Sequence, residues 1–188
     1  MSTVAPPMTT EEMLTLPDNG AQRELVLGEL RETPMTKRNR NHSSAEARIA
    51  YLLGRWLDQH PQPGTRLSSG EAGFRLRRGP DTTVGIDVAF VSAEVVANSE
   101  GRFPYFEGPP ILAVEILSPT DRQESIDEKI AVYRDANVPL IWIIDPVLKT
   151  VLVLRKDDEP VMFNVRQELS GEPELPGFLV LVAEIFRF

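Results

Sequence analysis

Two acidic residues stand inside apolar segments, where an ionised carboxylate is costly to bury. Glu115 interrupts the apolar run over 111–117, and Asp87 opens another apolar run upstream. A carboxylate in such surroundings needs a hydrogen-bonding partner or a metal ion. By the two-residue period of a strand, each acid shares its face with an alanine, Ala89 or Ala113, which leaves room beside the acid. Two such acids on adjacent strands can bind one divalent cation.

A lysine on a predicted helix completes this pattern. The helix over about 122–136 carries an apolar stripe formed by Ile126, Ile130 and Tyr133. Lys129 lies three residues after Ile126 and four before Tyr133, within or beside that stripe. The lysine is therefore predicted to point toward the sheet or along its rim, where it would join the two acids in one constellation.

Each of these residues also has a purely structural explanation. Asp87 can belong to a turn at the start of its strand, Glu115 can pair with a buried arginine, and Lys129 can extend from the helix flank to solvent. Glu24 can lie on a hairpin surface or in a site, and His42 can be a surface or capping histidine. Taken together, two strand acids followed by an inward lysine favour a functional site.

The composition restricts the metals that such a site can hold. The chain of 188 residues has no cysteine and two histidines, His42 and His60. Disulfides, thiolate zinc sites, cysteine nucleophiles and sites built from several histidines are therefore excluded. Oxygen ligands remain, and these are typical of magnesium, manganese or calcium.

The charge balance argues against a surface that coats nucleic acid everywhere. There are 20 basic and 28 acidic residues, a net charge of −8, although a local basic patch is compatible with this balance. No segment approaches the ~20 apolar residues of a membrane span. The start, MSTVAPPMTTEEM, lacks the basic and apolar regions of a signal peptide. The sequence therefore predicts a cytoplasmic protein without membrane association.

The N-terminal part of the chain is predicted to form small elements. Residues 1–8 are expected to be a disordered leader, because they are small and contain proline. Thr9 or Thr10 begins a short capped helix, and the segment 23–34 alternates around a glycine like a small β-hairpin. The polar, basic segment 36–42 is expected to be a loop.

The rest of the chain predicts an alternation of strands and helices. Ser43 and Glu46 fit a capping box that begins a long helix, and Glu46 has no other expected role. Strands are expected within 65–92 and at 111–118, 139–145 and 150–156, a loop at 93–108, a helix over about 122–136, and a strand or short helix at 178–186. This order predicts a single α/β domain over 9–188 with a mixed sheet.

Several stretches together resemble a known family. In chain order they are MTTEEMLTLP, RELVLGEL, EAGFRL, DVAFVS, LAVEILSPTDR, EKIAVYRDANVPLIWIIDP and LPGFLVLVAEIF. From Met8 to Phe188 the chain resembles the Uma-type restriction endonuclease family, within the PD-(D/E)xK nuclease-like superfamily. The resemblance implies a restriction-endonuclease-like α/β fold, a mixed β-sheet flanked by helices, with an additional N-terminal hairpin.

The same resemblance implies a nuclease site. The superfamily's aspartate corresponds to Asp87 and its strand glutamate to Glu115. The usual lysine two residues after that glutamate is replaced by Leu117, and the family's lysine on the following helix corresponds to Lys129. One position departs from the family pattern, since Ile86 stands where a proline is usual. That proline shapes the backbone and does no chemistry.

The resemblance also implies a metal and further polar residues. Glu24 and His42 match recurrent polar positions and are secondary catalytic candidates. A Mg²⁺ ion (or Mn²⁺) is expected to be held by Asp87, Glu115 and the carbonyl of Ile116. The expected activity is metal-dependent endonucleolytic hydrolysis of DNA phosphodiester bonds.

Two clusters of cations are expected to meet DNA phosphates. They are Lys37, Arg38 and Arg40 before the first long helix, and Arg75, Arg77 and Arg78 before Asp87. The alternative is a catalytically inactive nuclease-fold domain that binds DNA or a protein partner. Hydrolysis of another phosphoester would use the same residues. No string of residues indicates base-specific readout, and a homodimer is compatible with the sequence.

Overall fold

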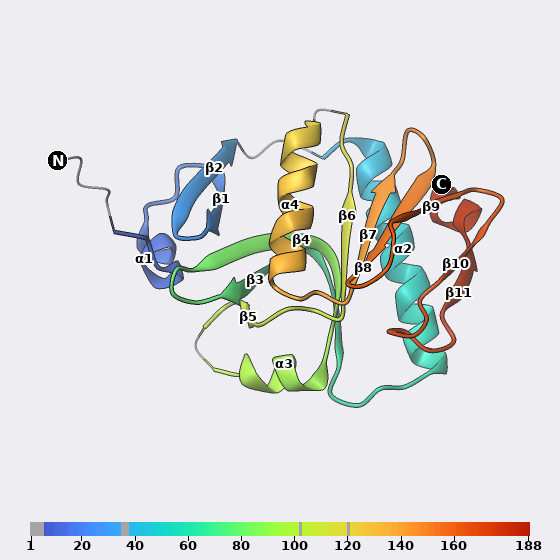
Figure 1. Cartoon of the computed structure of the whole chain (residues 1–188), viewed down its shortest axis with the longest axis horizontal. Coiled ribbons are helices and arrows are strands. Elements are labelled where there is room, and N and C mark those ends of the chain that lie inside the picture. The colour runs from blue at the N-terminus through green and yellow to red at the C-terminus, as the bar shows by residue number, and fades with distance from the viewer. Residues whose placement is uncertain (1–5, 35–37, 102, 120) are drawn as a thin grey trace.

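The structure is a computed structural model that describes residues 6–34, 38–101, 103–119 and 121–188. The strands of the main sheet are β1 (Ala21–Val26), β2 (Glu29–Pro34), β3 (Arg66–Arg77), β4 (Thr82–Val91), β5 (Phe106–Glu107), β6 (Leu112–Ile116), β7 (Leu140–Asp145), β8 (Thr150–Arg155) and β9 (Val161–Asn164). Their order is β2-β1-β4-β6-β7-β8-β9, with β3 paired to β4 and β5 to β3 (Figure 1). A separate two-stranded sheet consists of β10 (Glu168–Ser170) and β11 (Leu179–Leu181).

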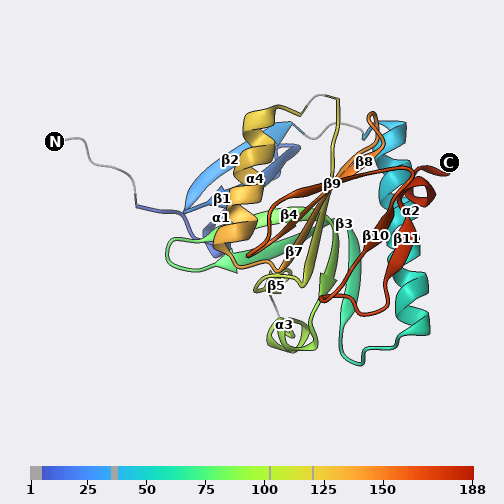
Figure 2. The same cartoon turned by 45° about the vertical axis from the view of Figure 1, so that its right-hand side comes forward.

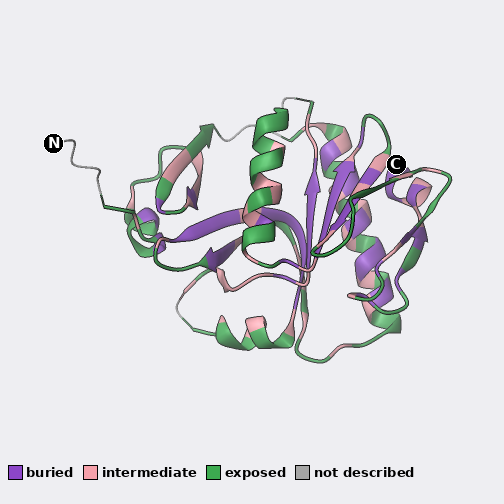
Figure 3. Cartoon of the chain, viewed as in Figure 1, coloured by how far each residue is buried: buried purple, intermediate pink, exposed green. Residues whose placement is uncertain are grey.

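Helices cover both faces of the main sheet (Figure 2). One face packs against α2 (Arg40–Gln59), with β10, β11 and the 3₁₀ helix η1 (Val182–Phe186) joining the same hydrophobic cluster. The other face packs against α4 (Gln123–Asp135). Strand β6 is buried along its whole length and pairs in parallel with β7, as expected of a central strand covered on both faces (Figure 3).

The N-terminal elements form as the sequence predicts. The short helix α1 (Thr10–Thr15) begins with a capping box, in which Thr9 accepts from the Glu12 N–H and Glu12 accepts from the Thr9 N–H. Strands β1 and β2 form the predicted hairpin. Residues 1–5 of the predicted leader lie outside the described residues, whereas the Met8 N–H donates to the Gly28 carbonyl at 2.9 Å.

Strand β4 is the strand on which the site depends, because its pairing changes along its length. One side pairs antiparallel with β3. On the other side, Thr83 pairs with Leu25 of β1, and Val88 to Phe90 pair with β6. Between these two contacts, over 84–87, no described strand pairs with that side of β4. The sheet therefore opens beside Asp87.

The observed boundaries correct several predictions. Helix α2 begins at Arg40 because Asn39 caps it, accepting from the N–H groups of Asn41 and His42. The predicted capping box at Ser43 is therefore wrong, and the end of the predicted loop 36–42 is helical. The predicted loop 93–108 contains α3 (Ala93–Asn98), capped by Ser92, and β5. Strands β9 and β10 were not predicted.

The predicted architecture is confirmed in its main features. A mixed sheet lies between helices, and an additional hairpin extends it at the N-terminal side. The strands expected at 111–118, 139–145 and 150–156 and the helix expected over 122–136 are all present. Among the described helices, none has the length and apolar character needed to cross a membrane.

Candidate functional site

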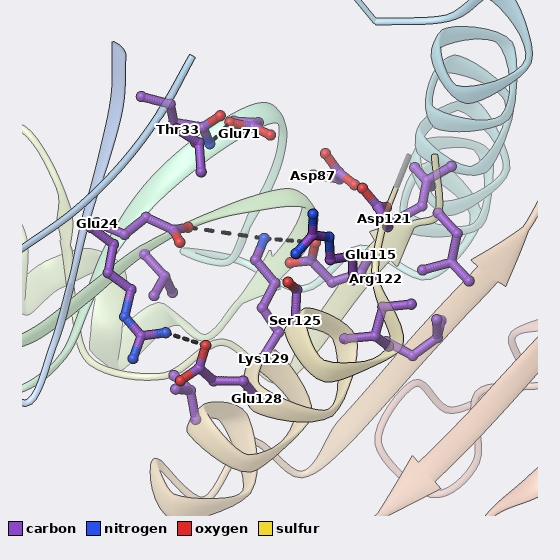
Figure 4. A pocket seen from close by; sticks show the side chains of 18 of the residues that line it. Glu24, Thr33, Glu71, Asp87, Glu115, Asp121, Arg122, Ser125, Glu128 and Lys129 are labelled. Atoms are coloured by element: carbon purple, nitrogen blue, oxygen red, sulfur yellow. Dashed lines mark hydrogen bonds and ion pairs between the residues drawn. The ribbon is translucent and has the colours of Figure 1, made fainter. Parts of the chain in front are cut away.

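An open pocket of about 440 Å³ lies beside the unpaired stretch of β4 (Figure 4). Its walls come from the β1–β2 hairpin, the middle of β4, the end of β6 and the N-terminal turns of α4. Five of the six residues predicted to act in catalysis or metal binding line it, namely Glu24, Asp87, Glu115, Ile116 and Lys129. The fold thus brings these residues together from four separate elements.

Lys129 lies between two carboxylates and the backbone of β4. Its Nζ donates to Glu115 Oε2 at 2.9 Å and lies 3.9 Å from Glu24 Oε1. The same Nζ donates to the Gly85 carbonyl at 3.4 Å, and Glu24 accepts from the Gly85 N–H at 3.1 Å. Glu24 and Lys129 thereby satisfy backbone groups of β4 that a neighbouring strand would otherwise satisfy. Burial lowers the pKa of Lys129, but the neighbouring carboxylates, Glu115 foremost, raise it above its ordinary value.

Glu115 is buried, and each of its carboxylate oxygens accepts a hydrogen bond. Tyr133 donates its hydroxyl to Oε1, and Lys129 donates to Oε2. Tyr133 is fully buried and lies one helical turn from Lys129. Burial raises the pKa of Glu115 to about 7 although the Lys129 ammonium lowers it, and the nearby Asp87 carboxylate adds to the rise. A carboxyl group shifted by burial and by specific charges in a pocket is typical of functional sites.

Asp87 is buried at the edge of the same pocket and connects it to α2. Its Oδ2 accepts from the Ile116 N–H at 2.8 Å and lies 3.3 Å from His42 Nε2. Burial raises the pKa of Asp87, but hydrogen bonds from His42 and from the Ile116 N–H outweigh burial and leave the pKa below its ordinary value. Asp87 is therefore an anion in a buried position, held by donors from α2 and β6.

Of the first group of predicted DNA-contacting residues, Lys37, Arg38 and Arg40, the structure places Arg38 at the pocket. Arg38 lines it, forms an ion pair with Glu71, and places Nη2 3.4 Å from Asp87 Oδ1. Arg40 is exposed in the first turn of α2. Lys37 lies outside the described residues.

The second group lies at the other end of β4. Arg75 pairs with Thr83 in the β3–β4 register, four positions or roughly 13 Å along β4 from Asp87. Its side chain is buried, and its guanidinium is surrounded by three carboxylates, those of Glu11, Asp81 and Glu107. Because these acids occupy the guanidinium, the predicted phosphate contact is not supported for Arg75.

Arg77 and Arg78 are exposed but share this remote position. Arg77 pairs with Thr82 at the start of β4, and Arg78 Nη2 lies 3.0 Å from Glu107 Oε2. The structure therefore does not bring these two cations to the pocket that contains Asp87.

Sequence reasoning missed three residues at the site. Tyr133 was assigned only to the apolar stripe, although its spacing of four from Lys129 places the two on one helix face. Glu46 was assigned to helix capping, but it lies four residues after His42 inside α2 and accepts from the Gly70 N–H at 2.8 Å. Arg122 lines the pocket at the N-terminal end of α4. The sequence signal that could have found Tyr133 and Glu46 is their spacing of four residues from Lys129 and His42, which places each pair on one helix face.

Two sets of side chains can hold a divalent cation here. Asp87 and Glu115 offer carboxylate oxygens in the pocket, and oxygen ligands suit magnesium and manganese. In addition, His42, Glu46 and Asp87 each offer one ligand atom, and these atoms all lie within 4.8 Å of one another. The combination of carboxylates, a nearby ammonium and an open pocket is suited to chemistry on an anionic substrate.

Comparisons with known proteins identify the family and the fold of the chain. The profile of the Uma2 family, described as "Putative restriction endonuclease", matches residues 10–183. The chain belongs to the Uma2 family. No curated protein matches it. Among solved structures, this Uma2 chain is similar to the one described as "Crystal structure of a putative nuclease belonging to DUF820 from Anabaena variabilis ATCC 29413".

The likeness to the solved structure extends over almost the whole of both chains. It covers 96% of this Uma2 chain and 98% of the other, with a TM-score of 0.76 and 21% sequence identity. At this identity the likeness establishes the fold, and it confirms the predicted restriction-endonuclease-like architecture. Membership of the Uma2 family supports a nuclease as the general class of the protein.

Proposed function

We propose that this Uma2 protein is a Mg²⁺- or Mn²⁺-dependent endonuclease that hydrolyses DNA phosphodiester bonds. The observation that carries the proposal is the convergence of Asp87, Glu115 and Lys129 on one open pocket, from β4, β6 and α4. Two acids and one ammonium at the same cavity are the groups that phosphodiester hydrolysis requires, since it needs charge stabilisation and an oriented water.

The residues present fit a hard divalent cation. Asp87, Glu115 and the Ile116 carbonyl would hold it, and each carboxylate group keeps acceptor capacity beyond the hydrogen bonds it already accepts. Burial of two carboxylates within one pocket also leaves negative charge that a cation neutralises. When bound, such a cation supplies Lewis acidity toward a phosphate oxygen and a template for water.

Lys129 supplies the mobile positive charge of the site. Its ammonium has three donors, and the longer of its two hydrogen bonds is the one to the Gly85 carbonyl, at 3.4 Å. Exchanging that contact for a water or a phosphate oxygen leaves the bond to Glu115 in place. Lys129 can then hold the attacking water and stabilise the charge that develops on the phosphate.

The other polar residues orient these groups. Tyr133 fixes the carboxylate of Glu115 from inside α4, and Glu24 holds Gly85 and faces Lys129. His42 lies beside Asp87 from α2 and helps to keep it ionised. We therefore assign Glu24 and His42 as positioning residues.

The proposed DNA contact lies on the arginines around the pocket. Arg38 and Arg122 line it, and Arg40 is exposed at the start of α2, two residues before His42. Their guanidinium groups would meet backbone phosphates, and Lys37 is proposed as a further contact. Because the whole chain carries a net charge of −8, DNA binding is expected to depend on these few arginines.

The test is cleavage of supercoiled and linear DNA in Mg²⁺ or Mn²⁺ by the parent and by Asp87→Asn, Glu115→Gln and Lys129→Met. Each variant is expected to lose about 10²- to 10³-fold in rate, by analogy with removal of one electrostatic donor. Glu128→Gln is the matched control, because Glu128 lines the same pocket but pairs with Arg31. Variants that cleave as fast as the parent would overturn the assignment.

The same assay separates the alternatives. A parent protein that binds DNA without cleaving it in either metal would support the non-catalytic nuclease-fold domain. Cleavage of a small phosphodiester such as bis-p-nitrophenyl phosphate without cleavage of DNA would indicate another phosphoester as substrate.

A further inference from the structure

The imidazole of His42 has one nitrogen that its described surroundings leave unsatisfied. His42 is fully buried. Its Nε2 faces Asp87 Oδ2 at 3.3 Å and Arg38 Nη1 at 3.4 Å. Its Nδ1, equally buried, has no hydrogen-bond partner among the described residues. A buried polar atom without a partner is costly and calls for an explanation.

The nitrogen without a partner faces a carboxylate. Nδ1 of His42 lies 3.8 Å from Glu46 Oε2. Among the described residues, no hydrogen bond joins these two atoms.

The spacing of these two atoms suits a metal ion better than a hydrogen bond. A separation of 3.8 Å is too long for an N–H···O hydrogen bond. Two metal–ligand bonds of about 2.1 Å that meet at an obtuse angle span this distance. His42, Glu46 and Asp87 each offer one ligand atom, a ring nitrogen or a carboxylate oxygen, and these atoms all lie within 4.8 Å of one another.

We propose that His42, Glu46 and Asp87 form a second cation position, which takes a first-row transition-metal dication such as Mn²⁺ or Zn²⁺ in preference to Mg²⁺. The proposal deepens the proposed function and rests on it for Asp87 as a metal ligand. Imidazole nitrogen favours transition metals, whereas Mg²⁺ favours oxygen ligands and keeps its waters. The position differs in this respect from the all-oxygen pair of Asp87 and Glu115.

The surroundings provide a route for the ion and a competitor for it. The Glu46 side chain is partly exposed, whereas His42 and Asp87 are closed off, so an ion enters past Glu46. The guanidinium of Arg38 lies 3.4 Å from both Asp87 Oδ1 and His42 Nε2. Because this fixed positive charge repels a cation, Arg38→Ala is expected to bind Mn²⁺ more tightly than the parent.

The test uses Mn²⁺ bound to the intact protein in the absence of nucleic acid. Pulsed electron paramagnetic resonance is expected to detect ¹⁴N coupling from a coordinated imidazole. The chain has only two histidines, so His42→Gln should abolish the coupling and His60→Gln should retain it. His60 stacks on Trp56 and lies outside the cluster, which makes it a matched control.

A second variant keeps the test independent of the buried histidine. Glu46→Gln retains an acceptor for the Gly70 N–H, and it is expected to weaken Mn²⁺ binding about tenfold or more while Mg²⁺ binding changes less than twofold. Isothermal titration calorimetry measures both. Absence of ¹⁴N coupling in the parent, or equal losses for the two metals, overturns the proposal and indicates that a proton on Nδ1 takes this place.

The two proposals fail in distinguishable ways. If the parent shows ¹⁴N coupling but never cleaves DNA, the second cation position stands and the nuclease is wrong. If the parent cleaves DNA without ¹⁴N coupling, the reverse holds. Glu115→Gln is expected to retain the coupling, because Glu115 belongs to the other pair of ligands.

Discussion

Two groups of charges in this protein each combine one cation with three acids, but the pKa values of their acids are shifted differently. The Arg75 cluster comprises Arg75 with three acids, namely Glu11, Asp81 and Glu107. The pocket cluster comprises Lys129 with three acids, namely Glu24, Asp87 and Glu115. In the first cluster the pKa values of Glu11 and Asp81 both lie below their ordinary values. In the second, the pKa of Asp87 is also lowered, but burial raises the pKa of Glu115 to about 7.

The difference lies in how completely the cation satisfies its acids. A guanidinium offers five donors in a fixed plane and can serve several carboxylates at once, whereas an ammonium offers three from a single point. The Arg75 cluster is therefore self-contained. Each cluster has more acids than cations, but the acids of the pocket cluster line an open cavity, where a divalent cation would balance their charge. The comparison indicates that excess charge beside a cavity, rather than buried charge alone, distinguishes a candidate site from a structural ion pair.

The largest expected effect on stability comes from the self-contained cluster. Arg75→Leu leaves the buried Asp81 carboxylate without its guanidinium partner and is expected to lower the free energy of unfolding by about 3–5 kcal/mol. Urea denaturation measures the loss. Metal-dependent thermal stabilisation of the folded variant should match that of the parent, and a loss of this response would place Arg75 in the site after all.

Lys129→Met is the corresponding change in the pocket cluster. It is expected to reduce the DNA cleavage rate about 10²- to 10³-fold, with a smaller loss of stability than Arg75→Leu, because Glu115 can take up a proton when the ammonium is removed. Single-turnover cleavage and urea denaturation of both variants give the comparison. A Lys129→Met protein that is as destabilised as Arg75→Leu would mean that both clusters are structural.

The two clusters are expected to respond to pH in opposite directions in metal-free protein kept in EDTA. The pKa of Glu115 is raised to about 7 in the folded state, so between roughly pH 4.5 and 7 the folded protein binds more protons than the unfolded chain. Stability therefore rises as pH falls through this window, by at most about 1.4 kcal/mol per pH unit. Denaturation series of the parent and of Glu115→Gln measure this, and the variant should lack the rise.

Below about pH 4.5, the pH dependence of the free energy of unfolding is expected to come mainly from the Arg75 cluster. Burial raises the pKa of Asp81, but hydrogen bonds from Thr10 outweigh it and leave the pKa below its ordinary value. Its contribution is present above the unfolded pKa and is lost as pH falls further. Asp81→Asn should reduce the loss of stability below about pH 4.5. An unchanged loss of stability in this range would contradict the hydrogen-bonded state of Asp81.

The smallest expected effect concerns the exposed cations. Arg38→Ala and Arg122→Ala should each reduce the salt dependence of DNA binding by about one counterion, because both residues line the pocket. Arg78→Ala, at the Arg75 cluster, should leave it unchanged. Fluorescence anisotropy at several salt concentrations measures the slope, and an Arg78 effect equal to that of Arg38 would move the DNA path away from the pocket.

Much of the pocket cluster was accessible from the sequence because its members contradict their local surroundings. Asp87 and Glu115 are acids at strand positions that favour hydrocarbon, and Lys129 shares a helix face with Tyr133. The architecture was accessible for the same reason, since long apolar runs such as 111–117 specify central strands. These signals require no knowledge of distant contacts.

The rest depended on contacts between distant parts of the chain. Arg75 near the end of a strand has the pattern of an exposed cation, and its partners Glu11 and Glu107 lie 64 and 32 positions away. The sequence explained Glu46 as part of a capping box with Ser43, but the helix begins earlier and is capped by Asn39. Local patterns could not show either residue's neighbours.

The interrupted pairing of β4 has a consequence for the proposed reaction. At Gly85, the side chains of Glu24 and Lys129 make the backbone hydrogen bonds that a neighbouring strand would otherwise make. An ammonium that turned toward a substrate would leave the Gly85 carbonyl without this donor, and a water or ligand would have to replace it. Substrate binding and the hydrogen bonding of this sheet edge would then be linked through a single nitrogen atom.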